Sequence, residues 1–279
     1  MAKLDFDYTK YRVPTDGAFS LASLDPADTQ GLDEERDEDA AKDLLDENQE
    51  RLDDLQERLF AERKQSLLLV LQAMDTAGKD STIRKVMGDL NPQGCQVTSF
   101  KAPSKEELDH DFLWRVHDHA PANGMIAIFN RSHYEDVLIV RVHGWASSAL
   151  IEQRYGHINA FEKMLADHGT RIIKVMLNIS KDYQLERLRR RLRRPDKHWK
   201  FNPGDLKERA RWDDYMDAYE TALRRCSTPY APWYVIPAEN RWFRDLVISR
   251  LLVDTLETMN PQFPEPNFDP ADYPPESLS

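Results

Sequence analysis

The residues best suited to chemistry lie at positions 73–82, between an aliphatic run and a helix-forming segment. The spacing from Ala73 to Gly78 and Lys79 matches the pattern of phosphate-binding loops, in which two glycines with four residues between them precede a lysine. Such a loop directs backbone N–H groups and a helix N-terminus at an anion, and its lysine reaches the terminal phosphates. The pattern therefore predicts a phosphate site, with contacts from Ala77, Gly78, Lys79, Asp80, Ser81 and Thr82.

Two positions depart from the usual loop. Ala73 replaces the first glycine, and Asp80 stands where a Mg²⁺-binding Ser or Thr is common. Asp75 is informative, because a carboxylate beside phosphates repels them unless a cation lies between. We therefore predict that Asp75 is a Mg²⁺ ligand and a catalytic residue with Lys79. An ordinary strand-to-helix turn, with Asp75 as a helix N-cap, is the alternative.

A second polar cluster follows the apolar run 125–129. Ligands of parallel α/β sheets bind beyond the carboxyl ends of the strands, so residues that emerge there face the same crevice as the loop. We predict that Asn130 binds Mg²⁺ directly or through water and that Arg131 contacts phosphate, with Tyr134 and Glu135 contributing to the nucleotide site. A simple turn is the alternative.

A basic segment comes later in the chain. Residues 174–211 carry 13 Lys or Arg against five acids, a local net charge of +8. On a helix, Arg187, Arg190 and Arg194 share one face, while Arg189 and Arg193 share another. One guanidinium group can bind two phosphate oxygens at once. We therefore interpret residues 187–204 as a mobile lid that closes over the phosphates. We expect its phosphate contacts to be Arg190, Arg194, Lys197 and Lys200.

A basic segment of this kind also suits two different roles. One is a solvated helix face. The other is nucleic-acid binding, but only Trp199 and Phe201 interleave with the cations, and residues 25–57, with a net charge of −12, would repel a duplex. We therefore expect no nucleic-acid partner.

Hydrophobic patterning predicts the elements that must position these residues. Short apolar runs at 67–71, 96–100, 125–129, 171–177 and 233–236 read as strands, and they alternate with amphipathic segments. Such alternation is typical of a doubly wound α/β sheet with about five parallel strands. We divide the chain into an N-terminal arm and acidic helix (1–62), a main domain (63–260) and a Pro-rich tail (261–279). Residues 205–225 are expected to form one helix.

Composition indicates the cellular compartment in which the protein works. The longest aliphatic run, 67–71, is far too short to cross a bilayer, and no signal-like run occurs in the first thirty residues. Two cysteines, Cys95 and Cys226, cannot make a disulfide framework. We expect a cytoplasmic protein with no membrane partner.

With these residues identified, the chain resembles the polyphosphate kinase 2 family over nearly its whole length. The resemblance rests on residues 72–84, Asn91-Pro92-Gln93-Gly94, residues 97–101, residues 107–115, residues 129–135, Lys197-His198-Trp199-Lys200-Phe201, Trp212-Asp213-Asp214-Tyr215 and residues 231–237. Many unrelated segments in the right order are more specific than the loop alone.

The resemblance implies a P-loop kinase-like fold with a helical lid and Mg²⁺-dependent transfer of a phosphoryl group between inorganic polyphosphate and adenine nucleotides. Mn²⁺ is a potential substitute, and a homo-oligomer is expected. The family's loop aspartate and lysine correspond to Asp75 and Lys79, and its second motif corresponds to Asn130-Arg131. The form of residues 130–135 and the arm Tyr11-Arg12-Val13-Pro14 resemble the subgroup that acts on AMP as well as ADP.

The expected reaction is direct in-line transfer. A phosphate oxygen is already ionised at neutral pH, so no general base is assigned. Two alternatives stay open: an ATP-dependent kinase of a small metabolite, and a polyphosphate- or nucleotide-binding protein without catalysis.

Overall fold

Five parallel strands form the centre of the structure, a computed structural model that describes residues 4–274. The strand order β2-β3-β1-β4-β5 places β1 in the middle, with β3 and β4 on either side. The five strands match the predicted apolar runs to within two residues at each end. Their bounds are β1 (Ser66–Ala73), β2 (Cys95–Ser99), β3 (Ile126–Asn130), β4 (Thr170–Asn178) and β5 (Trp233–Pro237).

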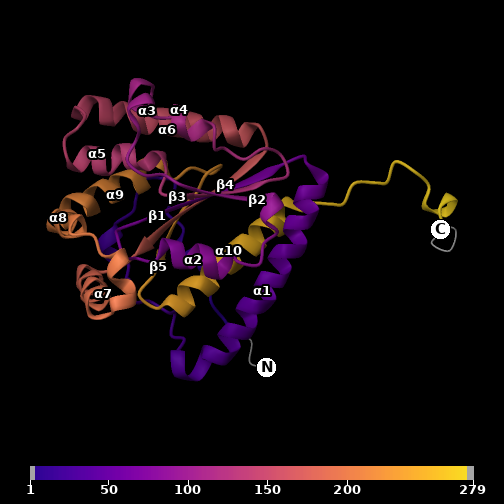
Figure 1. Cartoon of the computed structure of the whole chain (residues 1–279), viewed down its shortest axis with the longest axis horizontal. Coiled ribbons are helices and arrows are strands. Elements are labelled where there is room, and N and C mark those ends of the chain that lie inside the picture. The colour runs from indigo at the N-terminus through magenta and orange to yellow at the C-terminus, as the bar shows by residue number, and fades with distance from the viewer. Residues whose placement is uncertain (1–3, 275–279) are drawn as a thin grey trace.

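Helices cover both faces of this sheet (Figure 1). One layer contains α1 (Glu34–Glu62), α2 (Lys79–Val86) and α10 (Arg241–Met259), with α10 in contact with both of the others. The other layer contains α5 (Ile139–Val142), α6 (Ser148–Asp167) and α9 (Trp212–Cys226), together with α3 (Lys105–Asp109) and α4 (Trp114–His117). The predicted doubly wound sheet is therefore confirmed.

The central strand explains why the loop is rigidly placed. Every residue of β1 is buried, and Leu67 to Leu71 are fully inaccessible to solvent. A strand with helices on both faces needs such a continuous apolar run, because neither side meets water. In the register of the sheet, Leu71 pairs with Asn130 and Ala73 pairs with Leu177, so the polar residues that follow β1 and β3 emerge at one edge.

The N-terminal region packs against this core. Helix α1 starts at Glu34, where Asp33 caps it by accepting from the Arg36 amide. Four of its leucines are buried, at Leu45, Leu52, Leu55 and Leu59. The described part of the preceding arm, from residue 4, forms two short 3₁₀ turns, Tyr8–Tyr11 and Leu21–Ser23. It lies along the edge of the sheet, where the amide of Val13 donates to the Trp233 carbonyl at 2.9 Å.

One expectation needs correction. The segment 205–225 is not one helix: α8 (Gly204–Ala210) ends with Arg211 as its C-cap, and α9 begins at Trp212 on a new axis, so α8 turns back toward the lid. Trp114 is 44% exposed and stacks on His110. The described part of the tail extends away from the body (Figure 1). None of the helices within residues 4–274 is long and apolar enough to span a bilayer.

Candidate active site

A cavity of about 790 Å³ opens at the carboxyl edge of the sheet. The loop after β1 forms its floor, the ends of β2 and β3 form one wall, and the lid forms the other. Ten of its lining side chains are cationic and only Asp75 and Asp80 are anionic, which makes it a site for a highly charged anion. The cations are Lys79, Lys101, Arg131, Arg187, Arg190, Arg191, Arg194, Lys197, Lys200 and Arg241.

The phosphate loop has the backbone conformation that its sequence predicts. Gly78 has a φ of 108° and immediately precedes α2, which begins at Lys79. The Lys79 ammonium donates to the Ala73 carbonyl at 2.9 Å, and the Ser81 hydroxyl donates to the Gly78 carbonyl at 2.7 Å. Burial and the neighbouring Arg131 lower the pKa of Lys79, although Asp75 opposes this shift. The lysine is thus partly desolvated and held across the loop, where an incoming anion would meet it.

Ala73, which replaces the usual glycine, needs no unusual conformation. It is the last residue of β1, and it is not among the described residues with positive φ. The left-handed conformation occurs instead at Thr76, with a φ of 72°. The Thr76 hydroxyl is buried and has no hydrogen-bond partner within the described chain. It lines the cavity, so a ligand oxygen could satisfy it.

The loop is supported from below by Arg244, which the sequence did not single out. This arginine of α10 is only 1% exposed and pairs with Asp245 at 2.7 Å. Its guanidinium donates to the Ala77 carbonyl at 3.3 Å and to the Ser81 hydroxyl at 3.4 Å. A buried cation therefore lies behind the loop and fixes two of its groups.

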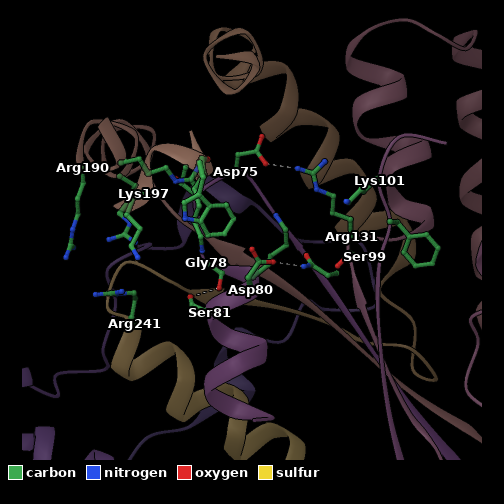
Figure 2. Close-up of a pocket in the computed structure, with 18 of the residues that line it drawn as sticks. Asp75, Gly78, Asp80, Ser81, Ser99, Lys101, Arg131, Arg190, Lys197 and Arg241 are labelled. Carbon is green, nitrogen blue, oxygen red and sulfur yellow. Dashed lines mark hydrogen bonds and ion pairs between the residues drawn. The ribbon is translucent and has the colours of Figure 1, made fainter. Parts of the chain in front are cut away.

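The structure brings the two predicted motifs together. Arg131 donates from Nη2 to the Asp75 carboxylate at 2.6 Å, and Asn130 donates from Nδ2 to the Asp80 carboxylate at 2.7 Å (Figure 2). Arg131 adopts the left-handed conformation, with a φ of 64°, as it turns away from β3. Four side chains, from the loop after β1, the first turn of α2 and the end of β3, therefore form the polar centre of the cavity.

The lid is built from α7 (Lys181–Arg193) and a 3₁₀ segment, Pro195–Lys200. Of the two helix faces expected from the spacing, the one with Arg187, Arg190 and Arg194 lines the cavity, whereas Arg189 and Arg193 do not line it. Arg194 and Lys197 both pair with Asp196 at 3.0 Å, and Arg191 pairs with Asp205 at 3.3 Å.

Other cations of the cavity are free of such partners. Among residues 4–274, Arg187, Arg190 and Arg241 form no ion pair within 4.0 Å. Burial and its cationic neighbours, with Arg241 first among them, lower the pKa of Arg187. The same three arginines also line a second cavity of about 530 Å³, which adjoins the first between α2, α7 and the start of α10. The crevice thus continues past the loop.

Four of the predicted contacts do not line the cavity: Ala77, Thr82, Tyr134 and Glu135. The Ala77 amide donates to the Met74 carbonyl, and Thr82 is fully buried. Tyr134 is the clearest correction, because its side chain is fully buried and its hydroxyl donates to Glu162 at 2.9 Å. Burial raises the pKa of Glu135, which lies behind Arg131 and Lys79 rather than in the opening.

Tyr134 belongs to a buried ionic cluster that the sequence analysis missed. The Lys174 ammonium donates to Glu162 at 2.5 Å and to the Tyr134 hydroxyl at 2.9 Å, and all three side chains are fully buried. Lys174 was counted in the basic segment, but its charge is neutralised inside the core. The only sign of a different role in the sequence is that Lys174 is flanked by apolar residues within the predicted strand 171–177.

Several other lining residues also escaped prediction, among them Ser99 at the end of β2, Lys101 just after it, and Arg241 at the start of α10. In Figure 2, Ser99 and Lys101 lie on one side of the loop, while Arg190, Lys197 and Arg241 lie on the other. The end of β2 could have been noticed, because polar residues that follow a parallel strand face the same edge.

The donor set suits a hard divalent cation. Mg²⁺ is usually held by one or two carboxylates together with substrate phosphates and water. Asp75 and Asp80 supply two carboxylates at the cavity floor, and the amide of Asn130 adjoins them. No group of three or more His, Cys, Asp or Glu side chains within residues 4–274 forms a complete metal cage, so phosphate oxygens would have to complete the coordination.

Fold and site together define an α/β protein in which a loop with the form of a phosphate-binding loop joins the central strand to the following helix, beneath an arginine-rich lid. Residues 35–264 match the sequence profile of the family described as polyphosphate kinase 2 (PPK2). The chain belongs to this family.

Individual relatives extend the comparison. The chain is 51% identical over 257 residues to an AMP/ADP-polyphosphate phosphotransferase of Meiothermus ruber, covering 92% of this chain and 96% of that protein. It is 46% identical to an ADP-polyphosphate phosphotransferase of Rhodopseudomonas palustris, covering 80% and 81%. The crystal structure of polyphosphate kinase 2 from Arthrobacter aurescens TC1 superposes with a TM-score of 0.90 at 51% identity, covering 94% and 93%.

Proposed function

We propose that this protein is a kinase that transfers phosphoryl groups between inorganic polyphosphate and the adenine nucleotides AMP and ADP. The observation that carries the proposal is the crevice, in which ten cations surround two carboxylates beside a phosphate-binding loop. One nucleotide does not need so long a basic surface. The relatives named above act on the same pair of substrate classes, polyphosphate and an adenine nucleotide.

The two substrates are assigned to opposite sides of the loop. The nucleotide phosphates lie toward Ser99 and Lys101, on the opposite side of the loop from Arg190 and Lys197. The polyphosphate chain lies toward the lid, because Arg187, Arg190 and Arg241 line both the main cavity and the adjoining one. These three arginines, which form no ion pair within residues 4–274, can neutralise successive phosphates of a linear polyanion.

The transferred phosphoryl group lies over the loop. Lys79 and Arg131 stabilise the negative charge on its oxygens, and the desolvated setting of Lys79 strengthens this interaction. The acceptor phosphate oxygen carries its own charge, so no side chain has to remove a proton. The lid arginines exclude water and hold donor and acceptor in line.

We propose further that the reaction depends on Mg²⁺, or on Mn²⁺ in its place, held by Asp75 with Asp80 and Asn130 nearby. Bound there, the cation would neutralise phosphate charge. Arg131 donates to one oxygen of Asp75, and Asn130 donates from its amide nitrogen to one oxygen of Asp80. The second oxygen of each carboxylate and the amide oxygen of Asn130 take no part in these two bonds, so they are the groups assigned to the cation.

A direct assay tests the proposal. Purified protein is incubated with polyphosphate, Mg²⁺ and either ADP or AMP, and the nucleotides are separated by chromatography. We expect ATP from ADP and ADP from AMP, with both products absent when chelator removes the metal. Turnover that requires ATP and a small metabolite would instead identify a metabolite kinase. Binding of polyphosphate without any turnover would identify a binding protein.

We also infer that the protein works in the cytoplasm as a homo-oligomer. The free state of Cys95 and Cys226 supports a reducing compartment. Light scattering at the assay concentration tests the assembly, and a monomeric mass would remove that part of the proposal.

A further inference from the structure

We infer that Gln184 is a positioning residue, which couples the lid to the catalytic loop by holding the backbone of Asp75. This inference rests on the proposed function, because it concerns the same phosphoryl transfer. Gln184 lies in the first turns of α7, at the root of the lid, and it does not line the cavity. It is only 1% exposed, which is unusual for a glutamine on a highly charged helix.

The Gln184 side chain joins two parts of the site. Its Nε2 donates to the main-chain carbonyl of Asp75 at 3.0 Å, and its Oε1 accepts from Nη1 of Arg209 at 3.3 Å. The same Arg209 nitrogen also donates to the Lys181 carbonyl in the first turn of α7. Both ends of the amide are therefore satisfied, and its orientation is fixed by the loop on one side and by α8 on the other.

Asp75 is consequently held at two points. Gln184 binds its carbonyl, and Arg131 binds its carboxylate at 2.6 Å. The next residue, Thr76, has a φ of 72°, a conformation that β-branched residues rarely adopt. Such a backbone persists only where surrounding contacts hold it. Removing the Gln184 bond would let the peptide after Asp75 rotate, and the carboxylate would move with it.

Helix α8 extends this connection to the phosphate-facing part of the lid. Arg209 contacts Gln184, and one turn earlier Asp205 pairs with Arg191, whose Nη1 also donates to the Lys200 carbonyl at 2.9 Å. A lid movement that shifts α7 against α8 therefore acts on Gln184. Through that side chain, it acts on the residue proposed to hold Mg²⁺.

The test is the variant Gln184→Met, which keeps the volume and removes both hydrogen bonds. We expect kcat to fall about tenfold or more, since small displacements of catalytic groups have effects of that size. We expect KM for ADP to change by less than about twofold, because the residue touches no substrate. The matched control is Gln56→Met: Gln56 is fully buried and exchanges two hydrogen bonds with the Asn91 backbone, away from the cavity. It should lower the melting temperature but leave kcat unchanged.

A double-mutant cycle separates positioning from mere stability. If Gln184 acts through the Asp75 carboxylate, Gln184→Met should cost less than about twofold in kcat when Asp75→Asn is already present. If the two substitutions lower kcat by factors that simply multiply in the double variant, the inference is overturned. An unchanged kcat in Gln184→Met would also overturn it. Should that variant fail to fold, Arg209→Met releases the far end of the amide together with the Lys181 carbonyl, keeps the bond from Gln184 to Asp75, and must show the same dependence on Asp75. A wild-type protein without turnover would refute the proposed function instead, so the two failures are distinguishable.

Discussion

Arg244 lies so close beneath Gly78 that a Cβ atom on Gly78 would stand 2.4 Å from its Nη1. The guanidinium cannot retreat easily, because it is buried, paired with Asp245 and bonded to the Ala77 carbonyl. Glycine is therefore required at position 78 for two reasons: its φ of 108° disfavours other residues, and Arg244 leaves no room for a Cβ atom. The loop and α10 form one unit.

Gly78→Ala should therefore disable the site. We expect phosphoryl transfer to fall by about 10²-fold or more, since displaced loop groups lose their hold on the transferred phosphate. The matched control is Gly156→Ala in α6, where a Cβ meets nothing within 4 Å and φ is not positive. That change should stabilise the protein by about 0.5–1 kcal/mol and leave turnover intact. Normal activity in Gly78→Ala would contradict the described loop geometry.

Lys79→Ala should nearly abolish transfer while the protein stays folded. Loss of one charge-stabilising group typically costs about 10²–10³ in rate. Because burial lowers the pKa of Lys79, we also expect the wild-type rate to decline at a less alkaline pH than an ordinary lysine would give. Steady-state rates and circular dichroism check both points, with the exposed Lys42→Ala as the control. The effect of removing one such group varies with its surroundings by roughly threefold. A Lys79→Ala rate within about threefold of the wild-type rate would therefore contradict the role given to Lys79.

Two neighbouring lid arginines provide a sharp comparison. Arg190 lines both cavities without an ion pair in the described chain, and the adjacent Arg189 lines neither. Arg190→Ala should raise KM for polyphosphate by about tenfold or more, whereas Arg189→Ala should change it by less than about twofold. KM for ADP should change little in either variant. Equal effects of the two variants would mean that the lid acts only through its overall charge.

The buried pair of Lys174 and Glu162 should dominate local stability. Burial alone would raise the pKa of Glu162, but Lys174 and His133 outweigh it and hold the pKa below its usual range. Lys174→Met leaves a carboxylate buried without its partner, so we expect a loss of about 3–5 kcal/mol in the free energy of unfolding. Adding Glu162→Gln should recover part of that loss. Urea denaturation measures both, and additive losses would argue against coupling.

Asp136 gives a pH-dependent prediction. Burial raises its pKa from 3.8 to about 6, although Arg154 opposes the shift from 3.2 Å. Because the folded protein keeps this proton longer than the unfolded chain, its contribution to stability is greatest below pH 3.8 and is lost as the pH rises to 6. Relative to Asp136→Asn, the wild type should gain up to roughly 3 kcal/mol between pH 7 and pH 4. Parallel denaturation curves at each pH would show no such gain if the shift were absent.

Local patterns predicted much of the fold and about half of the site. Each strand is a short apolar run, so its residues alone specify it. The face shared by Arg187, Arg190 and Arg194 follows from helical spacing, and the structure confirms that this face meets the cavity. The loop from Ala73 to Thr82 was also identified by its spacing, because its conformation depends on neighbours in the chain.

Long-range contacts explain what was missed. Gln184 and Arg244 act on the loop from 109 and 167 residues away, and nothing in their own segments marks them. Tyr134 was assigned to the site because it follows Arg131, yet its partner Glu162 is 28 residues further on and draws it into the core. The break at Arg211 was missed because residues 205–225 contain no Gly or Pro, whereas in the structure α8 contacts the lid through Asp205 and Arg209.

The adjoining cavities have a final consequence for the length of the substrate. Arg187, Arg190 and Arg241 line both cavities, and the second cavity is also lined by the carboxylates of Glu34, Glu186, Glu239 and Asp245. Under the proposed path, a polymer longer than the main cavity would therefore extend past the loop into a region of mixed charge instead of ending at the loop.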